Sequence, residues 1–421
     1  MERVGPPNDP RAHRSARRTR WTSYLLGAFG LGMSAQVLFL LTLRARELGA
    51  SFEVIGLIAG LTIAAPALFA VVTGAFVDRI GPMPSFVLGA LFAGATTVML
   101  IVVTDHRWFL VLGPVVGTCM TTAWTASQSQ VTGLGSRRER PAHTGRFSLF
   151  TNVGEMVGPL IAGLAFQVAG ARFAFLGPAA YAFLFSVIGV WLWFRSPTPP
   201  RHGERPPGLG IRAALRLAVR PAMQVALLLT SSRLWIHLVY VTFLPVHLVE
   251  SGLPGAVVGT VMATSGLVAA AVAPTAGILA RRWSEHGVTA VPLCFGALGL
   301  AMAPMLVELP WVYVVPLLIG IGSGLSLPLL LSLTTAAAPE SQRGIALGLR
   351  ATVNQTAGAA APATMGPLFS AFGAVVGFPA SGLGGVLLLV AAGVRHRLAA
   401  DRSADVAVDP RGRVDPASDA V

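Results

Sequence analysis

The stretch GAFVDRIG, Gly74 to Gly81, decides the fold because it places Asp78 beside Arg79 directly after more than twenty residues without a charge. The chain then turns at Gly81 and Pro82 and becomes apolar again. Charges between two long apolar runs are typical of a chain that leaves a lipid bilayer and re-enters it. The stretch therefore predicts a short loop between two membrane-spanning helices.

The composition of the whole chain favours a membrane protein. Of its 421 residues, 54% are hydrophobic and 12% are charged, and the mean hydropathy is +0.68, far from the usage of soluble domains. The formal net charge of +13 would suggest nucleic-acid binding in a soluble chain. Because the basic residues lie at the ends of apolar runs, we expect no nucleic-acid partner. Cys119 and Cys294 lie inside distant apolar runs, which favours packing over a disulfide.

Twelve apolar runs are long enough to cross the membrane, because about 20 helical residues span roughly 30 Å of hydrocarbon. The run from Trp21 to Leu43 has no small-residue cleavage site, so we interpret it as a retained first span and not as a signal peptide. The predicted spans are residues 22–43, 54–76, 84–104, 109–131, 147–169, 173–194, 221–246, 256–280, 288–307, 311–334, 345–369 and 374–394.

The arginines predict the orientation of the spans, since basic residues in short loops stay on the cytoplasmic side. All 31 basic residues are arginine. Twenty-five lie in the two tails and in every second connection, four lie in the opposite connections, and Arg233 and Arg350 fall inside spans. We therefore expect a protein of the cytoplasmic membrane with an even number of crossings and both termini in the cytoplasm.

The chain divides into two similar halves. Three glycines recur 203 positions later, and Asn152 recurs as Asn354 after 202 positions. The glycine pairs are Gly49 with Gly252, Gly56 with Gly259, and Gly74 with Gly277. Such a duplication predicts an all-α membrane protein with 12 transmembrane helices in two pseudo-symmetric six-helix bundles.

The predicted organisation has five parts. They are a cytoplasmic tail of residues 1–20, a bundle of residues 21–194, a linker of residues 195–220, a second bundle of residues 221–394 and a disordered tail of residues 395–421. The linker is rich in proline and arginine, and its last part, Ile211 to Arg220, fits either a basic helix on lipid headgroups or a solvated segment.

The opening stretch resembles the GxxxDRxG signature that transporters of the major facilitator superfamily carry between spans two and three. Gly74, Asp78, Arg79 and Gly81 match it, and the resemblance extends over all twelve spans. It implies a transporter in which this cluster latches the cytoplasmic side. Gly74 would allow a close helix contact, Asp78 would meet a helix N-terminus, and Gly81 would permit the turn. An ordinary solvated turn is the alternative.

The chain departs from the family pattern in several places. Pro82 and Met83 follow the second glycine, where basic residues are usual, and Arg281 stands where the second half would carry its acid. Drug exporters of this kind often have an arginine in span four and an acid in span one. Here residues 113–125 contain no arginine, and span one contains no acid. We therefore expect a weaker latch and a carrier that differs from a standard drug and proton antiporter.

A second motif in span five, GEMVGPLIAG, resembles the GxxxGPxxxG pattern of exporters that exchange drugs for protons. Its residues are Gly154, Gly158, Pro159 and Gly163. Small residues four apart make a flat helix face, and a proline bends the helix, so this span can pack closely and pivot. The resemblance favours export over import, although close packing alone would also explain the spacing.

Glu155 in the same span is the proton-coupling candidate. An ionised group near the bilayer centre costs about 2.5–3.5 kcal/mol on insertion scales, so it needs a partner or a water-filled cavity. Glu155 shares a helix stripe with Gly158, Pro159 and Ala162, so we expect it to face helices or a cavity. A carboxyl group shielded from water can exchange protons near neutral pH. A carboxylate held permanently charged by an arginine is the alternative.

The substrate-binding candidates lie in spans five, seven and eleven. Arg233 and His237 are one turn apart near mid-membrane, and the family resemblance implies that Arg233 binds an anionic group of the substrate or pairs with Glu155. His237 can titrate near neutral pH or pack as a neutral ring. The remaining candidates, each with a structural alternative, are Arg350, which can also reach the membrane surface, and Asn152 and Asn354, which can also hydrogen-bond between helices.

Together these features predict an alternating-access carrier, a monomer that exports a small organic molecule in exchange for protons. The sequence contains no GxxxxGK[ST] loop and no metal-ligating or catalytic constellation, so we expect no cofactor, no metal and no enzymatic activity. The expected partners are a small-molecule substrate, protons and the lipid bilayer. The alternatives are a proton-coupled uptake symporter for an anionic nutrient and a receptor that kept the fold without transport.

Overall fold

The protein is a bundle of helices in the part of the chain that the structure describes, residues 10–132, 134, 140–195, 211–339 and 342–407 of a computed structural model. No strand occurs among these residues. Ten of their helices are long and apolar enough to cross a membrane, and Phe52–Leu68 is a shorter apolar helix. The all-α membrane fold predicted from the sequence is confirmed, whereas the count of twelve spans stays a prediction.

Each half of the chain forms its own group of helices. The N-terminal half holds α1 (Pro10–Glu47), α2 (Phe52–Leu68), α3 (Ala70–Ile80), α4 (Pro82–Val102), η1 (His106–Trp108), α5 (Phe109–Thr132), α6 (Arg140–Ala174) and α7 (Leu176–Arg195). After the short helix α8 (Ile211–Ala218), the C-terminal half holds α9 (Pro221–Glu250), α10 (Gly255–Val272), η2 (Ala273–Thr275), α11 (Ala276–Arg282), α12 (Glu285–Met302), η3 (Trp311–Tyr313), α13 (Val314–Ala336) and α14 (Arg343–Ala407).

Glycine and proline explain where the observed helices differ from the predicted spans. The 65 residues of α14 are too many for one crossing at about 1.5 Å per residue, and Gly373, with a φ of 70°, divides the helix. The span predicted at residues 54–76 is broken between α2 and α3, shortly after Pro66, which lacks the N–H of an intact helix turn. When α14 is counted as two helices and α2 with α3 as one, the helices are compatible with the twelve predicted spans.

The tails and the linker also differ from the prediction. The tail predicted to be disordered from residue 395 is helical as far as Ala407, because alanine, leucine and arginine favour helix and no proline interrupts them before Pro410. Helix α1 begins at Pro10, inside the predicted tail of residues 1–20. The end of the linker forms α8, as one of the two alternatives expected, whereas residues 1–9, 196–210 and 408–421 lie outside the described residues.

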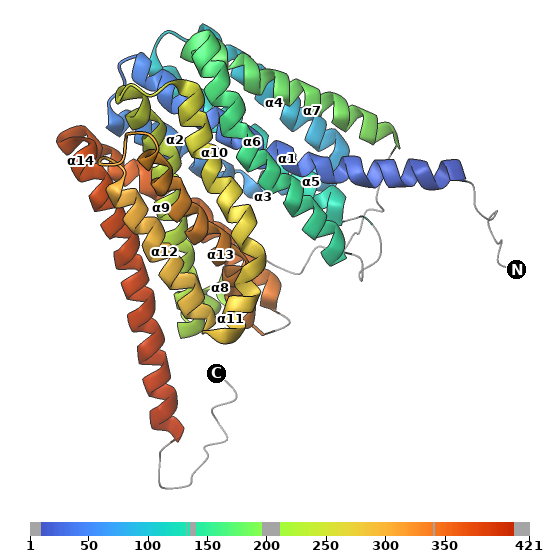
Figure 1. Ribbon diagram of the computed structural model, residues 1–421. Coiled ribbons are helices and arrows are strands. Elements are labelled where there is room, and N and C mark those ends of the chain that lie inside the picture. The colour runs from blue at the N-terminus through green and yellow to red at the C-terminus, as the bar shows by residue number, and fades with distance from the viewer. Residues whose placement is uncertain (1–9, 133, 135–139, 196–210, 340–341, 408–421) are drawn as a thin grey trace, which may run out of the picture.

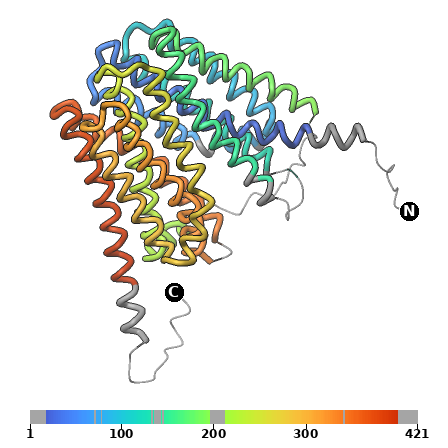
Figure 2. Tube along the Cα trace, in the orientation of Figure 1, coloured from blue at the N-terminus to red at the C-terminus, as the bar shows by residue number. Residues whose placement is uncertain are grey.

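The two halves meet at one end and lean apart at the other (Figures 1 and 2). Helix α6 packs against α10, and α2 packs against α14, so each half contributes one helix to each of two contacts. We call the end with the glycine turns at Gly49 and Gly252 the closed end. The opposite end, with the turn at Gly81 and with α8, is the open end.

Glycines let the backbones of the two halves touch. A Cβ atom on Gly163 of α6 would lie 2.4 Å from the carbonyl oxygen of Gly255 and 2.7 Å from the Cα atom of Gly259 in α10. A Cβ atom on Gly56 of α2 would lie 2.2 Å from the carbonyl oxygen of Pro362 in α14. Because a backbone atom cannot move aside as a flexible side chain can, these positions require glycine.

The duplication relates these two contacts to each other. Their residues recur at a single shift of 203 positions, as Gly56 with Gly259, Pro159 with Pro362, and Gly163 with Gly366. Pro159 and Gly163 belong to the motif of span five, and Pro362 and Gly366 repeat its Pro-x-x-x-Gly part in the second half. The contact of α2 with α14 is therefore the pseudo-symmetric copy of the contact of α6 with α10.

Polar contacts join the halves at the closed end. The Nε atom of Arg46 in α1 lies 2.5 Å from Oε1 of Glu250 in α9, and the Arg46 guanidinium lies 4.6 Å from the ring centre of Phe52. The other two contacts are backbone donors with side-chain acceptors. The N–H of Ala256 donates to Oε1 of Gln167 (2.9 Å), and the N–H of Glu53 donates to Oγ of Ser370 (2.8 Å).

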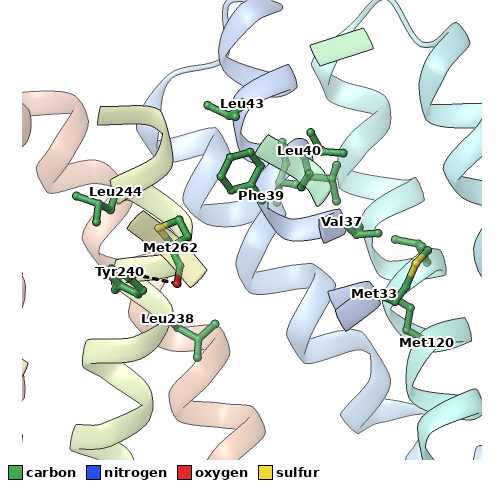
Figure 3. Close-up of a cluster of buried hydrophobic side chains, with 14 of the residues drawn as sticks. Met33, Val37, Phe39, Leu40, Leu43, Met120, Leu238, Tyr240, Leu244 and Met262 are labelled. Carbon is green, nitrogen blue, oxygen red and sulfur yellow. Dashed lines mark hydrogen bonds between the residues drawn. The ribbon is translucent and has the colours of Figure 1, made fainter. Parts of the chain in front are cut away.

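An aromatic cluster lies behind these polar contacts. Phe243 of α9 and Phe369 of α14 stack with ring centres 4.4 Å apart, and Phe52 of α2 lies 5.8 Å from Phe369. All three are less than one tenth exposed. Figure 3 shows the neighbouring buried core, which includes Phe39 of α1 and Met262 of α10. The closed end is thus filled by apolar side chains from both halves.

Toward the open end the contacts between the halves stop. A Cβ atom on Gly358 of α14 would still lie 3.4 Å from the Ile63 side chain of α2, and one on Gly266 of α10 would lie 3.4 Å from the Cα atom of Met156 in α6. Ten residues before Gly358 along α14, a Cβ atom on Gly348 would meet no described atom within 4 Å. Ile63 and Met156 thus mark the deepest contacts that glycines make across the boundary, beyond which the halves diverge in Figure 1.

The contact of α6 with α10 predicts the effect of adding one methyl group. Gly163→Ala should lower the thermal unfolding temperature of the purified protein, because overpacking against a rigid backbone costs about 1–3 kcal/mol. Gly393→Ala is the matched control, since a Cβ atom there would meet nothing within 4 Å and alanine favours helix. An unfolding temperature for Gly163→Ala at or above that of the control would contradict this contact.

The Arg46 and Glu250 pair predicts how the closed end responds to charge. The reporter is a cysteine at Ser34 in a chain without Cys119 and Cys294, labelled by an impermeant thiol reagent added from the closed end. Arg46→Glu should increase the rate of this labelling by about fivefold or less. The small effect follows from the partial exposure of both side chains, 37% and 39%. The double variant with Glu250→Arg should label as slowly as the parent, and equal rates for single and double variants would rule out the pair as a tie.

Candidate functional site

The stretch that opens the sequence lies at the open end, where the halves are apart. Gly81 has a φ of 94° and joins α3 to α4, so the predicted tight turn is present. A Cβ atom on Gly74 would meet nothing within 4 Å, and the same holds for its repeat Gly277. The close helix contact expected at Gly74 is therefore absent in this conformation. Arg79 is exposed, and the side chain of Asp78 lies outside the described residues.

The glycines of the span-five motif contact two different helices. A Cβ atom on Gly154 would lie 2.2 Å from the carbonyl oxygen of Ala28, and one on Gly158 would lie 2.6 Å from that of Gly32, both in α1. Gly163 instead faces α10 across the boundary between the halves. The motif thus attaches α6 to its own half along one part of its length and to the other half along the next.

Glu155 lies in the part of α6 that contacts α1, between Gly154 and Gly158, and approaches α9. Its Oε1 atom is 3.9 Å from Nε2 of His237, and its side chain is 34% exposed. The backbone of the next residue, Met156, is approached by Gly266 of α10, where a Cβ atom would lie 3.4 Å from the Cα atom of Met156. The carboxylate therefore lies beside the boundary between the halves and is partly exposed.

Two arginines complete the cluster around Glu155. Arg233 of α9 is close enough to interact electrostatically with Glu155, and Arg350 of α14 is close enough to interact with Arg233. The Nε atoms of both arginines and Nδ1 of His237 are buried without a hydrogen-bond partner among the described residues. Arg350 thus has an inward-facing neighbour, in contrast to the alternative in which it reaches the membrane surface.

The cluster combines candidates from three helices and both halves. Glu155 comes from the N-terminal half, and Arg233, His237 and Arg350 come from the C-terminal half. Asn354 lies one turn from Arg350, and its Oδ1 atom is buried without a hydrogen-bond partner in the described part of the chain. A site shared by both halves at their boundary is where a ligand would be contacted by each half as they move.

Asn152 makes no hydrogen bond to a member of this cluster in the described part of the chain. It is half-buried and lies about one turn before Glu155 on α6. No hydrogen bond joins it to Asn354 among the residues the structure describes, so the duplicated asparagines do not meet. The side chain of Tyr240, in contrast, is fully buried, and its hydroxyl lies 3.5 Å from the carbonyl oxygen of Met262 (Figure 3). Tyr240 therefore packs α9 against α10.

A cavity of about 150 Å³ lies between α1, α2, α5 and α14, the helix that also carries Arg350. It is lined by Ser34, Val37 and Leu38 of α1, Thr62, Ile63 and Pro66 of α2, Gly117, Met120 and Thr121 of α5, and Gln355 of α14. Gln355 directly follows Asn354, and Ile63 contacts α14 at Gly358, so this cavity adjoins the helix that carries Arg350. Its lining is mostly apolar with a few hydroxyl and amide groups.

The residues that line this cavity and the pair at the closed end were not predicted from the sequence. Ser34, Thr62 and Thr121 are single small polar residues inside apolar spans, a weak signal because such hydroxyls commonly bond to their own helix. Thr62 does so here, donating to the carbonyl oxygen of Ile58 (2.7 Å). Arg46 and Glu250 follow the first span of each half. Their opposite charges at nearly equivalent positions of the repeat are the sequence pattern from which this pair could have been predicted.

Solved structures of transporters share this fold. A bacterial homologue of the human lysosomal transporter Spinster, in an inward-facing, unoccupied conformation, matches with a TM-score of 0.76 and 16% identity, covering 91% of this chain and 97% of that one. Its occupied form matches with a TM-score of 0.72. A variant of the nucleoside transporter NupG matches with a TM-score of 0.74 and 12% identity, covering 90% and 99% of the two chains.

Sequence comparison gives the same assignment. The mouse (Mus musculus) protein solute carrier family 22 member 18 is 26% identical over 321 residues, which are 72% of this chain and 77% of that protein. A profile of the Major Facilitator Superfamily matches residues 21–362, most of the chain. The resemblance inferred from Gly74, Asp78, Arg79 and Gly81 is thereby confirmed, and the chain belongs to the Major Facilitator Superfamily of membrane transporters.

Proposed function

We propose that this protein is a secondary active transporter that exports a small organic molecule from the cytoplasm in exchange for protons. The observation that carries the proposal is the position of Glu155, His237 and Arg233 at the boundary where the halves part. A group that lies at the boundary of the halves, with neighbours from both, can change its exposure when the halves rock. Alternating access requires such a group.

Glu155 is the proton-carrying group in this proposal. Its carboxylate has Arg233 and His237 as neighbours, and Tyr240 lies in the same region of α9. When the carboxylate is protonated, its attraction for Arg233 is lost, so proton binding and substrate binding are linked through one guanidinium. Exchange requires the proton and the substrate to compete for this site, whereas an anion bound by the released Arg233 together with the proton would correspond to cotransport.

Export is supported by the span-five motif, and the membrane and sidedness follow from the arginines. Gly154, Gly158, Pro159 and Gly163 match the pattern of exporters, and the excess of arginine in alternate connections assigns both termini to the cytoplasm. In this orientation the open end faces the cytoplasm, and the protein acts as a monomer in the cell membrane. Uptake of an anionic nutrient with protons is the second candidate, favoured by the two arginines of the cluster.

Replacing Glu155 tests the proton coupling. In proteoliposomes that contain a pH-sensitive dye, compounds from a panel of drugs, dyes and organic acids should drive proton movement through the wild-type protein. Glu155→Gln should reduce this movement to the level of empty liposomes, because the amide cannot release a proton. Glu308→Gln, which changes an exposed carboxylate outside the spans, should retain it.

Three results would count against parts of this proposal. Full proton movement in Glu155→Gln would remove Glu155 as the coupling group. Absence of flux for every compound of the panel would favour a receptor that kept the transporter fold. Accumulation of substrate inside right-side-out vesicles instead of everted ones would replace export by uptake.

Topology is tested separately by labelling. Single cysteines at Arg46 and Glu308 should react with an impermeant thiol reagent added outside intact cells, whereas cysteines at Arg216 and Arg397 should react only after the membrane is opened, since basic connections stay in the cytoplasm. Cys119 and Cys294 are first replaced by serine. The reverse pattern would invert the assignment of the open end, and a mixed pattern would contradict an even number of crossings.

A further inference from the structure

The charges of the central cluster do not balance. Arg233 and Arg350 carry two positive charges, and Glu155 carries the single negative charge near them. His237 is 3.9 Å from Glu155, beyond hydrogen-bond distance, and adds a further positive charge when it is protonated. No ion pair within 4.0 Å involves Arg233 or Arg350 in the described part of the chain. The cluster thus holds an excess of one positive charge between two halves of a membrane protein.

An uncompensated charge in this position is costly, because the surrounding protein and lipid solvate ions poorly. The hydrogen-bonding capacity of the cluster is also unused. The N–H groups at Nε of Arg233 and Nε of Arg350 are buried and have no acceptor among the described residues. A guanidinium with its Nε–H free presents the edge that binds an oxyanion through two parallel hydrogen bonds.

The lining of the cavity indicates the chemistry of the rest of the ligand. Most of its lining is apolar, including Val37, Leu38, Ile63 and Met120. Gln355 joins it to the part of α14 that holds Arg350, so an anionic group near the arginines and an apolar body in the cavity can belong to one molecule. A cation would be repelled by the net charge, and a neutral molecule would leave the second arginine without a counter-charge.

We propose that Arg233 and Arg350 bind the anionic group of an organic monoanion, such as a carboxylate, whose apolar body lies in the cavity between α1, α2, α5 and α14. The inference rests on the proposed transport function and adds its substrate class. Arg350 is the residue that gives the site its net positive charge, since Arg233 alone would be balanced by Glu155. Removing Arg350 therefore removes the preference for anions.

Matched pairs of probes test the charge of the ligand. Benzoate and benzamide, and 2-naphthoate and 2-naphthamide, have nearly the same shape and differ in one negative charge. Calorimetric titration of the full-length protein in detergent should give at least about tenfold tighter binding of each carboxylate than of its amide, as expected for loss of a charge-assisted contact. This measurement needs no variant and does not depend on transport.

Variants of α14 assign the preference to Arg350. Arg350→Gln should bind each carboxylate no more tightly than its amide, whereas Arg350→Lys should keep part of the difference because the charge remains. Arg397→Gln is the matched control, an equal charge change at an exposed position of the same helix. The thermal unfolding temperature of each variant shows whether it is folded.

Three results would overturn the inference. They are equal binding of carboxylates and amides to the wild-type protein, no binding of either carboxylate at millimolar concentration, and the same preference in Arg350→Gln as in Arg397→Gln. The outcome is separate from that of the transport assay. Carboxylate binding without flux would contradict the transport proposal alone, and flux confined to neutral or cationic compounds would contradict the monoanion alone.

Discussion

The close approach of two pairs of backbones holds the molecule in its present conformation. At the contact of α6 with α10, and at its copy between α2 and α14, glycines leave no room for a single extra carbon atom. Such contacts are short-range, because dispersion and Cα–H···O interactions weaken within an ångström or two. They can hold two rigid halves together at one end and be lost on a small rotation. The polar and aromatic contacts of the closed end are arranged around them.

This geometry also places the charged cluster. Because α6 is attached to α1 through Gly154 and Gly158 and to α10 through Gly163, Glu155 lies close to the boundary between the halves. Arg233 approaches it from the other half. In the proposed transport cycle, a rotation of the halves would change the surroundings of the carboxylate and of the guanidinium together, and Arg350 lies close enough to Arg233 to take part. Substrate and proton would act on the same few atoms.

Much of the architecture follows from the sequence, since apolar runs of about 20 residues and a repeat of 203 positions are strong signals. The family was read from four residues, Gly74 to Gly81, and the helix-packing role of Gly163 from its motif. The site was less predictable. Glu155, Arg233 and Arg350 stand out as charges within apolar spans, but one-dimensional order does not show that three helices bring them together. The close helix contact expected at Gly74 is not present in this structure. The helix beyond residue 395 follows from the helix propensity of its residues, which the polar composition of the tail obscured.

The stacked rings of Phe52, Phe243 and Phe369 have a consequence for energy conservation. A carrier driven by an ion gradient must never offer ions a continuous aqueous path, because leakage would discharge the gradient on which it depends. Hydrated ions cannot enter a dry aromatic layer without losing their water shell, at a cost of many kcal/mol. If the protein works as proposed, the rings would act as an insulating layer at the closed end. Their packing would then determine how completely the membrane stays electrically tight while the open end admits substrate.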